Sequence, residues 1–266
     1  MQRRRWFVIM IVAVLALAVG PATARAGSGS TVPLASGRGG GGSAAPLAGG
    51  GSTGPLAGGG STVAVWQMNE PPGARTMIDS SGHGLRGSIG GEVGTGVRTG
   101  GAVGYRFSRL EPDTPPTHPR HLVTVADNAA LDPGTRDYAV TVRLRTRHHF
   151  GNIIQKGQAT VAGGSFKLQI PDGIVQCLFR GSSGSVIVSA PRRINDGRWH
   201  VVRCERVSSG LILVIDGAVV ARKAGRTGKI ANSWPLSIGG KTNCDQRTVG
   251  CDYYAGDIDY VTITAR

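Results

Sequence analysis

The feature that most constrains the fold of this chain is a series of short β-branched segments separated by turn residues, which begins at Val63 and continues to the C-terminus. In Ala139–Thr146 apolar and polar side chains alternate, which predicts a strand with one buried face. No segment repeats its apolar side chains with the 3.6-residue period of a helix. We therefore expect an all-β fold, a two-sheet antiparallel sandwich of about a dozen strands.

Two turn sequences predict hairpins within this region. Asp216 and Gly217 separate Leu211–Ile215 from Ala218–Ala221, and Pro171–Gly173 separates two further apolar runs. The Asp-Gly pair suits a turn with positive φ, whose twist matches that of the two strands it joins.

The N-terminal residues have the three parts of a secretory signal peptide. Met1–Arg5 is basic, Trp6–Val19 is an apolar run of 14 residues, and Ala24–Ala26 has the small-x-small pattern of a cleavage site. The apolar run is shorter than the roughly 20 residues of a membrane-spanning helix. We expect residues 1–26 to be removed, so that the mature protein is secreted without a membrane span. The general and twin-arginine routes both stay open, because Arg4 and Arg5 precede the apolar run.

The segment 27–62 has low complexity. A nonapeptide with Pro-Leu-Ala followed by three glycines occurs twice, at residues 45–53 and 54–62, with only its first residue changed. Such a sequence buries too little apolar surface to offset the entropy of ordering it. We predict a disordered Gly/Ser/Pro-rich linker over 27–62 and one domain over 63–266.

The charge of the chain narrows the set of partners. The formal net charge is +14, and removal of the four arginines of the signal peptide leaves +10. The arginines are scattered along strands and turns, whereas nucleic-acid binding usually needs a clustered basic face. We therefore do not expect nucleic acid as a partner, although the charge favours a loose attraction to anionic polymers.

Four cysteines lie late in the chain, at Cys177, Cys204, Cys244 and Cys251. An even number in a secreted protein favours two disulfides, and no Cys-x-x-Cys pair indicates zinc. Of the three possible pairings we predict Cys177–Cys204 and Cys244–Cys251. The first two cysteines lie in predicted core strands, and the last two bracket one short loop.

Several short motifs, in this order, resemble laminin G-like domains of the concanavalin A-like lectin/glucanase class. They are Val65–Glu70, Asp79–Gly84, Val123–Asp127, Leu131–Gly134, Tyr138–Val142, Ile154–Gly157, Asp196–His200, Leu213–Gly217, Ile238–Gly240 and Gly256–Val261. Each motif alone is weak, but their shared order covers almost the whole of 63–266. The resemblance implies a jelly-roll sandwich, in agreement with the strand pattern.

The same resemblance implies a structural calcium ion, Ca2+. Asp79 and Asp259 would supply carboxylate oxygens, and backbone carbonyls near His83 would supply others. In the alternative interpretation, Asp79 caps a turn through its own side chain, and Asp259 is a plain carboxylate at the rim of the sandwich.

Catalysis is the least favoured class of function. Asp257 and Asp259 are two apart on a predicted strand, so they share a face, as a pair of glycosidase carboxylates would. The related glucanases use a Glu-x-Asp-x-x-Glu strand, and none of the four glutamates here has that spacing. We therefore expect no enzyme, with a glycoside-cleaving enzyme as the weaker alternative.

The remaining class is a secreted, monomeric module that binds an extracellular glycan or protein; a structural or adhesive wall component is the alternative. Trp66 and Trp199 resemble anchors of the core. The side chains predicted to contact a ligand are Trp234, Asn243, Tyr253 and Tyr254, because aromatic rings stack on sugars and amides bind hydroxyl groups.

Overall fold

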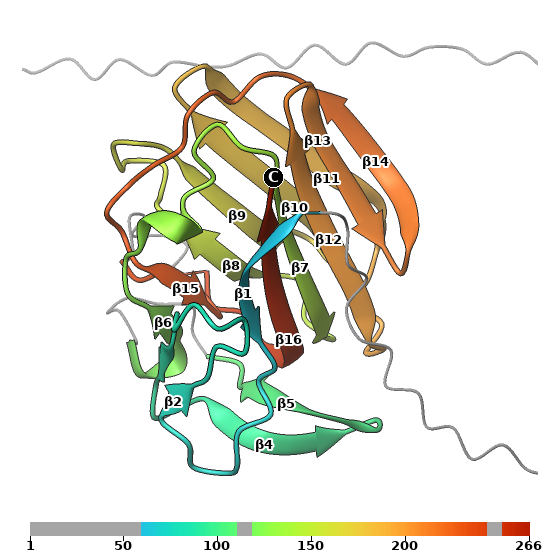
Figure 1. Cartoon of the computed structure of the whole chain (residues 1–266). Helices are drawn as coiled ribbons and strands as arrows, with labels where there is room; N and C mark the ends of the chain where they lie inside the picture. The colour runs from blue at the N-terminus through green and yellow to red at the C-terminus, as the bar shows by residue number, and fades with distance from the viewer. Residues whose placement is uncertain (1–59, 111–118, 244–251) are drawn as a thin grey trace, which may run out of the picture. The chain divides into compact units, whose positions relative to one another are not determined.

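The computed structural model of the chain describes residues 60–110, 119–243 and 252–266. The predicted signal peptide, nearly all of the predicted linker and the pair Cys244 and Cys251 lie outside these residues. The described residues form two antiparallel β-sheets and two short 3-10 helices, with no α-helix among them (Figure 1). None of their helices is long and apolar enough to cross a membrane. The all-β sandwich predicted from the strand pattern is therefore confirmed.

The first sheet, sheet A, has the order β14-β13-β12-β7-β16-β5-β4, with β1 also paired to β16. Its strands are β1 (Ser61–Trp66), β4 (Gly94–Thr99), β5 (Ala102–Phe107), β7 (Tyr138–Arg145), β12 (His200–Val207), β13 (Gly210–Ile215), β14 (Ala218–Ala224) and β16 (Gly256–Ala265). The C-terminal strand β16 lies between β7 and β5 (Figure 1), so residues far apart in the sequence meet on this sheet.

The second sheet, sheet B, has the order β11-β10-β9-β8-β15-β6-β3-β2. Its strands are β2 (Thr76–Met77), β3 (Gly87–Ile89), β6 (Val123–Val125), β8 (Gly151–Lys156), β9 (Ser165–Ile170), β10 (Ile174–Gly181), β11 (Gly184–Arg193) and β15 (Leu236–Ile238). The 3-10 helices η1 (Pro119–His121) and η2 (Ala129–Leu131) flank β6 in the sequence.

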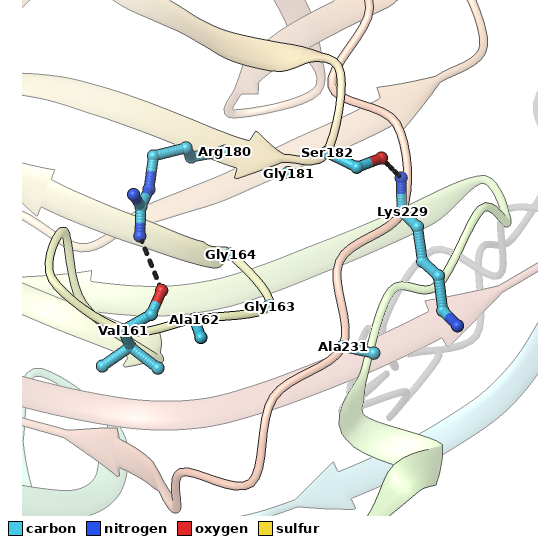
Figure 2. A pocket seen from close by; sticks show the side chains of 9 residues that line it. All are labelled: Val161, Ala162, Gly163, Gly164, Arg180, Gly181, Ser182, Lys229 and Ala231. Atoms are coloured by element: carbon cyan, nitrogen blue, oxygen red, sulfur yellow. Dashed lines mark hydrogen bonds between the residues drawn. The ribbon is translucent and has the colours of Figure 1, made fainter.

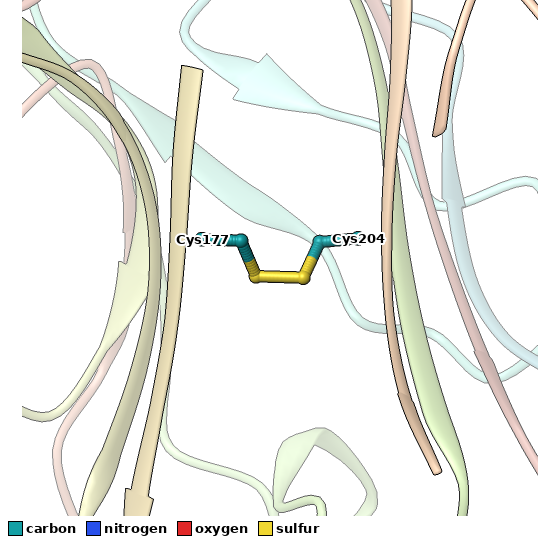
Figure 3. Close-up of a disulfide and its surroundings, with 2 residues drawn as sticks. All are labelled: Cys177 and Cys204. Atoms are coloured by element: carbon teal, nitrogen blue, oxygen red, sulfur yellow. A yellow bond between two sulfur atoms is a disulfide. The ribbon is translucent and has the colours of Figure 1, made fainter. Parts of the chain in front are cut away.

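The core lies between the two sheets, where the inward side chains of each strand meet. Trp66 is fully buried there, as expected of a core anchor, and so are Phe166 and Phe179, whose rings stack 5.5 Å apart. Cys177 of β10 and Cys204 of β12 form the expected disulfide between the sheets (Figure 3), with their Cα atoms 6.2 Å apart. The disulfide joins two strands that no backbone hydrogen bond connects.

The local elements follow the sequence pattern closely. Asp216 and Gly217 form the tight β13–β14 turn with φ angles of 51° and 81°, and Asp172 and Gly173 adopt similar angles between β9 and β10. One boundary differs from the prediction: β1 begins at Ser61, inside the expected linker. The first residues of β1 pair with the end of β16, about 200 residues later in the sequence. The local composition around Ser61 cannot predict this pairing.

Candidate functional site: a polar groove on sheet B

The outer face of sheet B carries two rows of side chains, polar except for Leu178, that run across neighbouring strands. In the first row Gln155 of β8 pairs with Lys167 of β9, and Lys167 pairs with Leu178 of β10. The residues that alternate with these along β9 and β10 point into the core. The first row therefore faces away from the core because the side chains of a strand alternate between its two faces.

The second row consists of amide side chains that hold one another in place. Gln169 of β9 donates a hydrogen bond from Nε2 to Gln176 Oε1 of β10. Gln176 Nε2 in turn donates to Ser189 Oγ of β11 at 3.1 Å. At the other end of the row, Asn152 Nδ2 donates to Gln155 Oε1 at 2.8 Å, which ties the two rows together. These hydrogen bonds orient the amides before any ligand arrives.

A groove of about 280 Å³ lies over these rows. Its polar lining includes Gln155, Lys167, Gln169 and Arg180, and Phe150 contributes an aromatic ring at its edge. Lys241 Nζ and Asp252 Oδ2 form an ion pair of 2.8 Å on the groove wall. The groove thus combines amides, cations, the carboxylate of Asp252 and the half-buried Phe150, while its other phenylalanine, Phe166, is buried in the core.

Gln158 and Arg180 share one wall of the groove. Arg180 donates from Nη2 to the backbone oxygens of Gln158 and Val161, at 2.6 and 3.1 Å. Gln158 is 5% exposed, and its Nε2 donates to the backbone oxygen of Asn243 at 2.7 Å. Gln158 Oε1 and Arg180 Nε have no hydrogen-bond partner among the described residues. A buried polar atom without a partner costs free energy. The hydrogen bonds that Gln158 and Arg180 make to backbone oxygens offset this cost and hold the wall in place.

A second hollow of about 510 Å³ lies on the other side of Arg180. Figure 2 shows Arg180 reaching towards Val161 beside a backbone of Gly163, Gly164 and Gly181. A Cβ atom at Gly163 would lie 1.9 Å from the backbone oxygen of Ala231, so only glycine allows these two segments to approach so closely. Lys229 lies at the far rim, where its backbone N–H donates to Ser182 Oγ.

The groove is suited to bind a chain of hydroxyl-rich units. Amide groups both donate and accept hydrogen bonds, which matches the two roles of a sugar hydroxyl. An aromatic ring such as that of Phe150 can cover the apolar face of a sugar ring.

Asp79 occupies a turn near the start of the domain, where the sequence predicted a calcium ligand. Its Oδ1 accepts hydrogen bonds from the backbone N–H groups of Val65 and Ser81, at 3.0 and 2.9 Å. Its Oδ2 accepts from the N–H of Leu85 at 3.0 Å and from Ser81 Oγ at 2.8 Å. Burial alone would raise the pKa of Asp79, but the hydrogen bonds from these three N–H groups outweigh it and lower that pKa.

These contacts leave little capacity for a cation at Asp79, because each carboxylate oxygen already accepts two hydrogen bonds. His83 Nδ1 lies 3.0 Å from both the Val63 backbone oxygen and Ser81 Oγ, and Asp259 pairs with Arg143. In 60–110, 119–243 and 252–266, no three His, Cys, Asp or Glu side chains form a metal-binding group. Asp79, His83 and Asp259 thus all have protein partners in this structure, and calcium binding stays a prediction.

Asp257 and Asp259, the pair weighed as glycosidase carboxylates, are each bound to arginine. Asp257 forms ion pairs of 2.8 Å with both Arg106 and Arg145, and Asp259 pairs with Arg143. The register of β16 against β7 also shifts between Ile258 and Tyr260. Both carboxylates are therefore occupied in holding sheet A together.

The structure separates the four side chains predicted to contact a ligand. Tyr253 and Tyr254 are 5% and 1% exposed, so the prediction that their rings stack on sugars is wrong. Both lie just before β16 and pack inwards, and Tyr254 Oη donates to the Arg145 backbone oxygen at 2.9 Å. Trp234 is half-buried and does not line the groove, whereas the exposed Asn243 touches the groove wall through its backbone oxygen.

Trp199, predicted as a core anchor, is half-buried on the outer face of sheet A. The guanidinium groups of Arg143 and Arg145 lie over its ring, 4.7 and 5.5 Å from the ring centroid. The cation–π contacts explain why the residue is not in the core.

The groove residues themselves were absent from the sequence prediction. Alternate polar side chains at Lys167, Gln169 and Gln176 mark the outer face of β9 and β10, and that signal is visible in the sequence. It does not identify which strands lie side by side, so it cannot assemble the rows into a groove.

Comparison with known proteins supports the fold. The family described as the laminin G domain matches residues 144–265. No curated protein sequence matches this one closely enough to serve as a relative.

Among solved structures, domain 4 of AbnA, a GH43 extracellular arabinanase from Geobacillus stearothermophilus solved with arabinotriose, has a TM-score of 0.52. It is 15% identical, over 77% of this chain and 93% of that one. The binding domain of Paraclostridial Mosquitocidal Protein 1 also has a TM-score of 0.52, at 10% identity, over 77% of this chain and 48% of that one. Domains LG4-5 of the mouse laminin alpha1 chain have a TM-score of 0.39 at 21% identity, over 49% and 35%. This chain therefore covers about half of the length of the mosquitocidal protein's binding domain and about a third of the laminin LG4-5 chain. At such identities the likeness concerns the fold alone.

Proposed function

We propose, from the match of residues 144–265 to the laminin G domain family, that the chain is a secreted, non-catalytic module that binds an extracellular glycan in the groove on sheet B. The observation that carries the proposal is that Gln155, Lys167 and Gln169 of the two rows line the groove. Hydrogen bonds with Asn152 and Gln176 orient the two glutamine amides. Ligand groups bind more tightly to side chains that are already held in place, because less conformational entropy is lost.

Three further observations support the proposal. The N-terminal residues have the pattern of a cleaved signal peptide, and the glycine-rich segment after it would act as a flexible tether. Domain 4 of the arabinanase shares the fold and was solved with arabinotriose, so the fold is compatible with oligosaccharide binding. The carboxylates that a glycosidase would need are engaged by arginines.

The test uses the mature chain purified from culture medium. Its intact mass should correspond to a chain that begins at Gly27. A panel of neutral oligosaccharides, including arabinan, xylan, cellulose and chitin fragments, is screened for saturable binding by calorimetry. We expect at least one of them to bind saturably without release of reducing sugar. Saturable binding to none of the glycans would favour the structural or adhesive alternative. Release of reducing sugar that is lost in Asp257→Asn would contradict the proposal in favour of an enzyme.

Variants with matched controls then locate the binding site. Gln169→Ala should weaken binding about tenfold, since it removes at least one hydrogen bond and loosens Gln176. Lys167→Ala should also weaken it. Gln67→Ala and Lys223→Ala make the same chemical changes at exposed positions outside the groove and should leave the affinity unchanged. Equal effects in both sets would show that the groove is not the binding site.

A further inference from the structure

Two apolar side chains lie next to each other at the groove on sheet B. Leu178 of β10 lines the groove, and its cross-strand partner on the neighbouring strand β11 is Ile187 (Figure 1). We propose that this apolar pair, Leu178 and Ile187, binds the methyl group of an acetamido substituent, so that the glycan is a polymer of N-acetylated amino sugars. The inference rests on the proposed glycan-binding function and narrows its ligand.

The register of β10 against β11 brings the two side chains together on the outer face of the sheet. Leu178 and Ile187 are direct partners, and opposite residues of an antiparallel pair have Cβ atoms about 4.5–5.5 Å apart. Ile187 is 43% exposed. The residues on either side of each are buried in the core, namely Cys177, Phe179, Val186 and Val188. Because side chains alternate between the faces of a strand, the apolar pair faces away from the core.

Polar side chains lie beside the apolar pair on the same face. Gln176 lies two residues before Leu178 on β10. Ser189 lies two residues after Ile187 on β11. Gln176 and Ser189 are also cross-strand partners, and Gln176 Nε2 donates to Ser189 Oγ at 3.1 Å. A ligand group on the apolar pair therefore has an amide and a hydroxyl group as its neighbours.

The two polar neighbours keep hydrogen-bonding capacity. The side-chain oxygen of Gln176 accepts one hydrogen bond, from Gln169 Nε2, and an amide oxygen has two lone pairs. The hydroxyl group of Ser189 accepts from Gln176 and donates to no protein group in the described part of the chain. Gln176 and Ser189 thus offer one acceptor and one donor, which are the partners that the N–H and C=O of an acetamido group require.

An apolar surface discriminates between an acetamido group and a hydroxyl group. The methyl part of the acetamido group gains free energy when it leaves water for apolar side chains. A hydroxyl group in the same place loses hydrogen bonds to water and finds no partner in Leu178 or Ile187. Fragments of chitin and cellulose differ in this substituent on each sugar ring, so they are matched ligands for the test.

The experiment measures binding of chitotriose and cellotriose to the mature full-length chain by calorimetry. We expect chitotriose to bind about tenfold more tightly, the discrimination typical of one added apolar group in a binding site. Glycan strands of peptidoglycan carry the same acetamido substituent, and their fragments show which polymer the site prefers. Tighter binding of either polymer fragment than of cellotriose supports the inference.

The variants test whether the apolar pair causes this preference. Ile187→Ser should reduce the affinity for chitotriose to that for cellotriose and leave the affinity for cellotriose unchanged, whereas a folding defect would weaken both. Ile187→Val keeps an apolar side chain and should keep the preference. Val219→Ser makes a similar change at a 50% exposed position on β14 of sheet A and should leave both affinities unchanged.

The outcomes separate this inference from the proposed function. Equal affinities for chitotriose and cellotriose would overturn the inference and leave the glycan-binding function in place. A preference for chitotriose that is the same in the native chain and in Ile187→Ser would also overturn it, because the apolar pair would not be the cause. Saturable binding of no glycan at all would contradict the proposed function, and the inference with it.

Discussion

Asp79 organises its turn by accepting four hydrogen bonds from Val65, Ser81 and Leu85, residues that are separate along the chain. The first of these bonds reaches across to β1, so the carboxylate links the turn to sheet A. Hydrogen bonds to a charged acceptor contribute more than those between neutral groups. The side chain thus has a structural function whether or not calcium binds nearby.

We predict that Asp79→Ala lowers the free energy of unfolding by roughly 1–2 kcal/mol, because it leaves three backbone N–H groups without their acceptor at a partly exposed site. Glu92→Ala, at an exposed carboxylate whose φ is not positive, serves as the control. Urea unfolding measures both. The same samples with millimolar calcium and with chelator test the calcium prediction, since a ligand of the folded state raises the melting temperature. A loss in Asp79→Ala no larger than that in Glu92→Ala would contradict the structural function.

The pKa of Asp79 predicts how this contribution depends on pH. The folded state lowers the pKa below its ordinary value of 3.8. The stabilisation is therefore complete above the ordinary pKa and is lost as the pH falls through the folded-state pKa. We expect the difference in unfolding free energy between the native chain and Asp79→Ala to be constant from pH 7 to about pH 5 and to shrink below about pH 4. A difference that grew in acid would contradict this sign.

The β13–β14 hairpin shows how one element depends on its turn. Asp216 accepts hydrogen bonds from the Val201 backbone N–H at 2.8 Å and from His200 Nδ1 at 2.7 Å, so the turn is anchored to β12. Gly217 has a φ of 81°, and a Cβ atom there would meet nothing within 4 Å. The requirement for glycine is therefore one of backbone conformation and not of space.

We predict that Gly217→Ala destabilises the domain by about 1 kcal/mol, the cost of placing a Cβ atom in the left-handed region. Gly217→Asn should cost less, since asparagine tolerates this conformation. Thermal unfolding of the two variants gives the comparison. Equal losses in both would show that a contact of the new side chain, and not its backbone, determines the effect.

At the scale of the whole molecule, the Cys177–Cys204 disulfide joins sheet B to sheet A across the core. Its two cysteines are separated by 27 residues, and both are buried. In the chain-entropy model such a cross-link restricts the unfolded chain and stabilises the folded one by about 3.5 kcal/mol.

We predict that the double variant Cys177→Ala, Cys204→Ala loses about that much stability, which lowers the melting temperature by roughly 10 °C for a domain of this size. The double variant Cys244→Ala, Cys251→Ala is the companion experiment, and its shorter loop predicts a smaller loss of about 2.5 kcal/mol. Peptide mapping without reductant checks both pairings. A Cys177–Cys244 peptide would contradict them.

The sequence by itself determined the elements of this protein. Alternation of side chains identified β7, turn residues with positive φ placed two hairpins, and the even cysteine count led to the disulfide between Cys177 and Cys204. These features depend on neighbours along the chain or on simple rules of strand geometry. The order of the motifs predicted a laminin G-like domain, and the model of the laminin G domain family matches residues 144–265.

Only the tertiary structure decided which faces became sites. Tyr254, predicted to contact a ligand, is buried, and its hydroxyl donates to a backbone oxygen inside the fold. Trp199, predicted in the core, packs against two arginines on the outer face of sheet A. The groove on sheet B arises from pairings such as Gln155 with Lys167. The ion pairs on sheet A arise from pairings such as Arg106 with Asp257, which are 151 residues apart. Strand order and register create these neighbours, and both are set by the burial of the whole core, which no local segment of sequence contains.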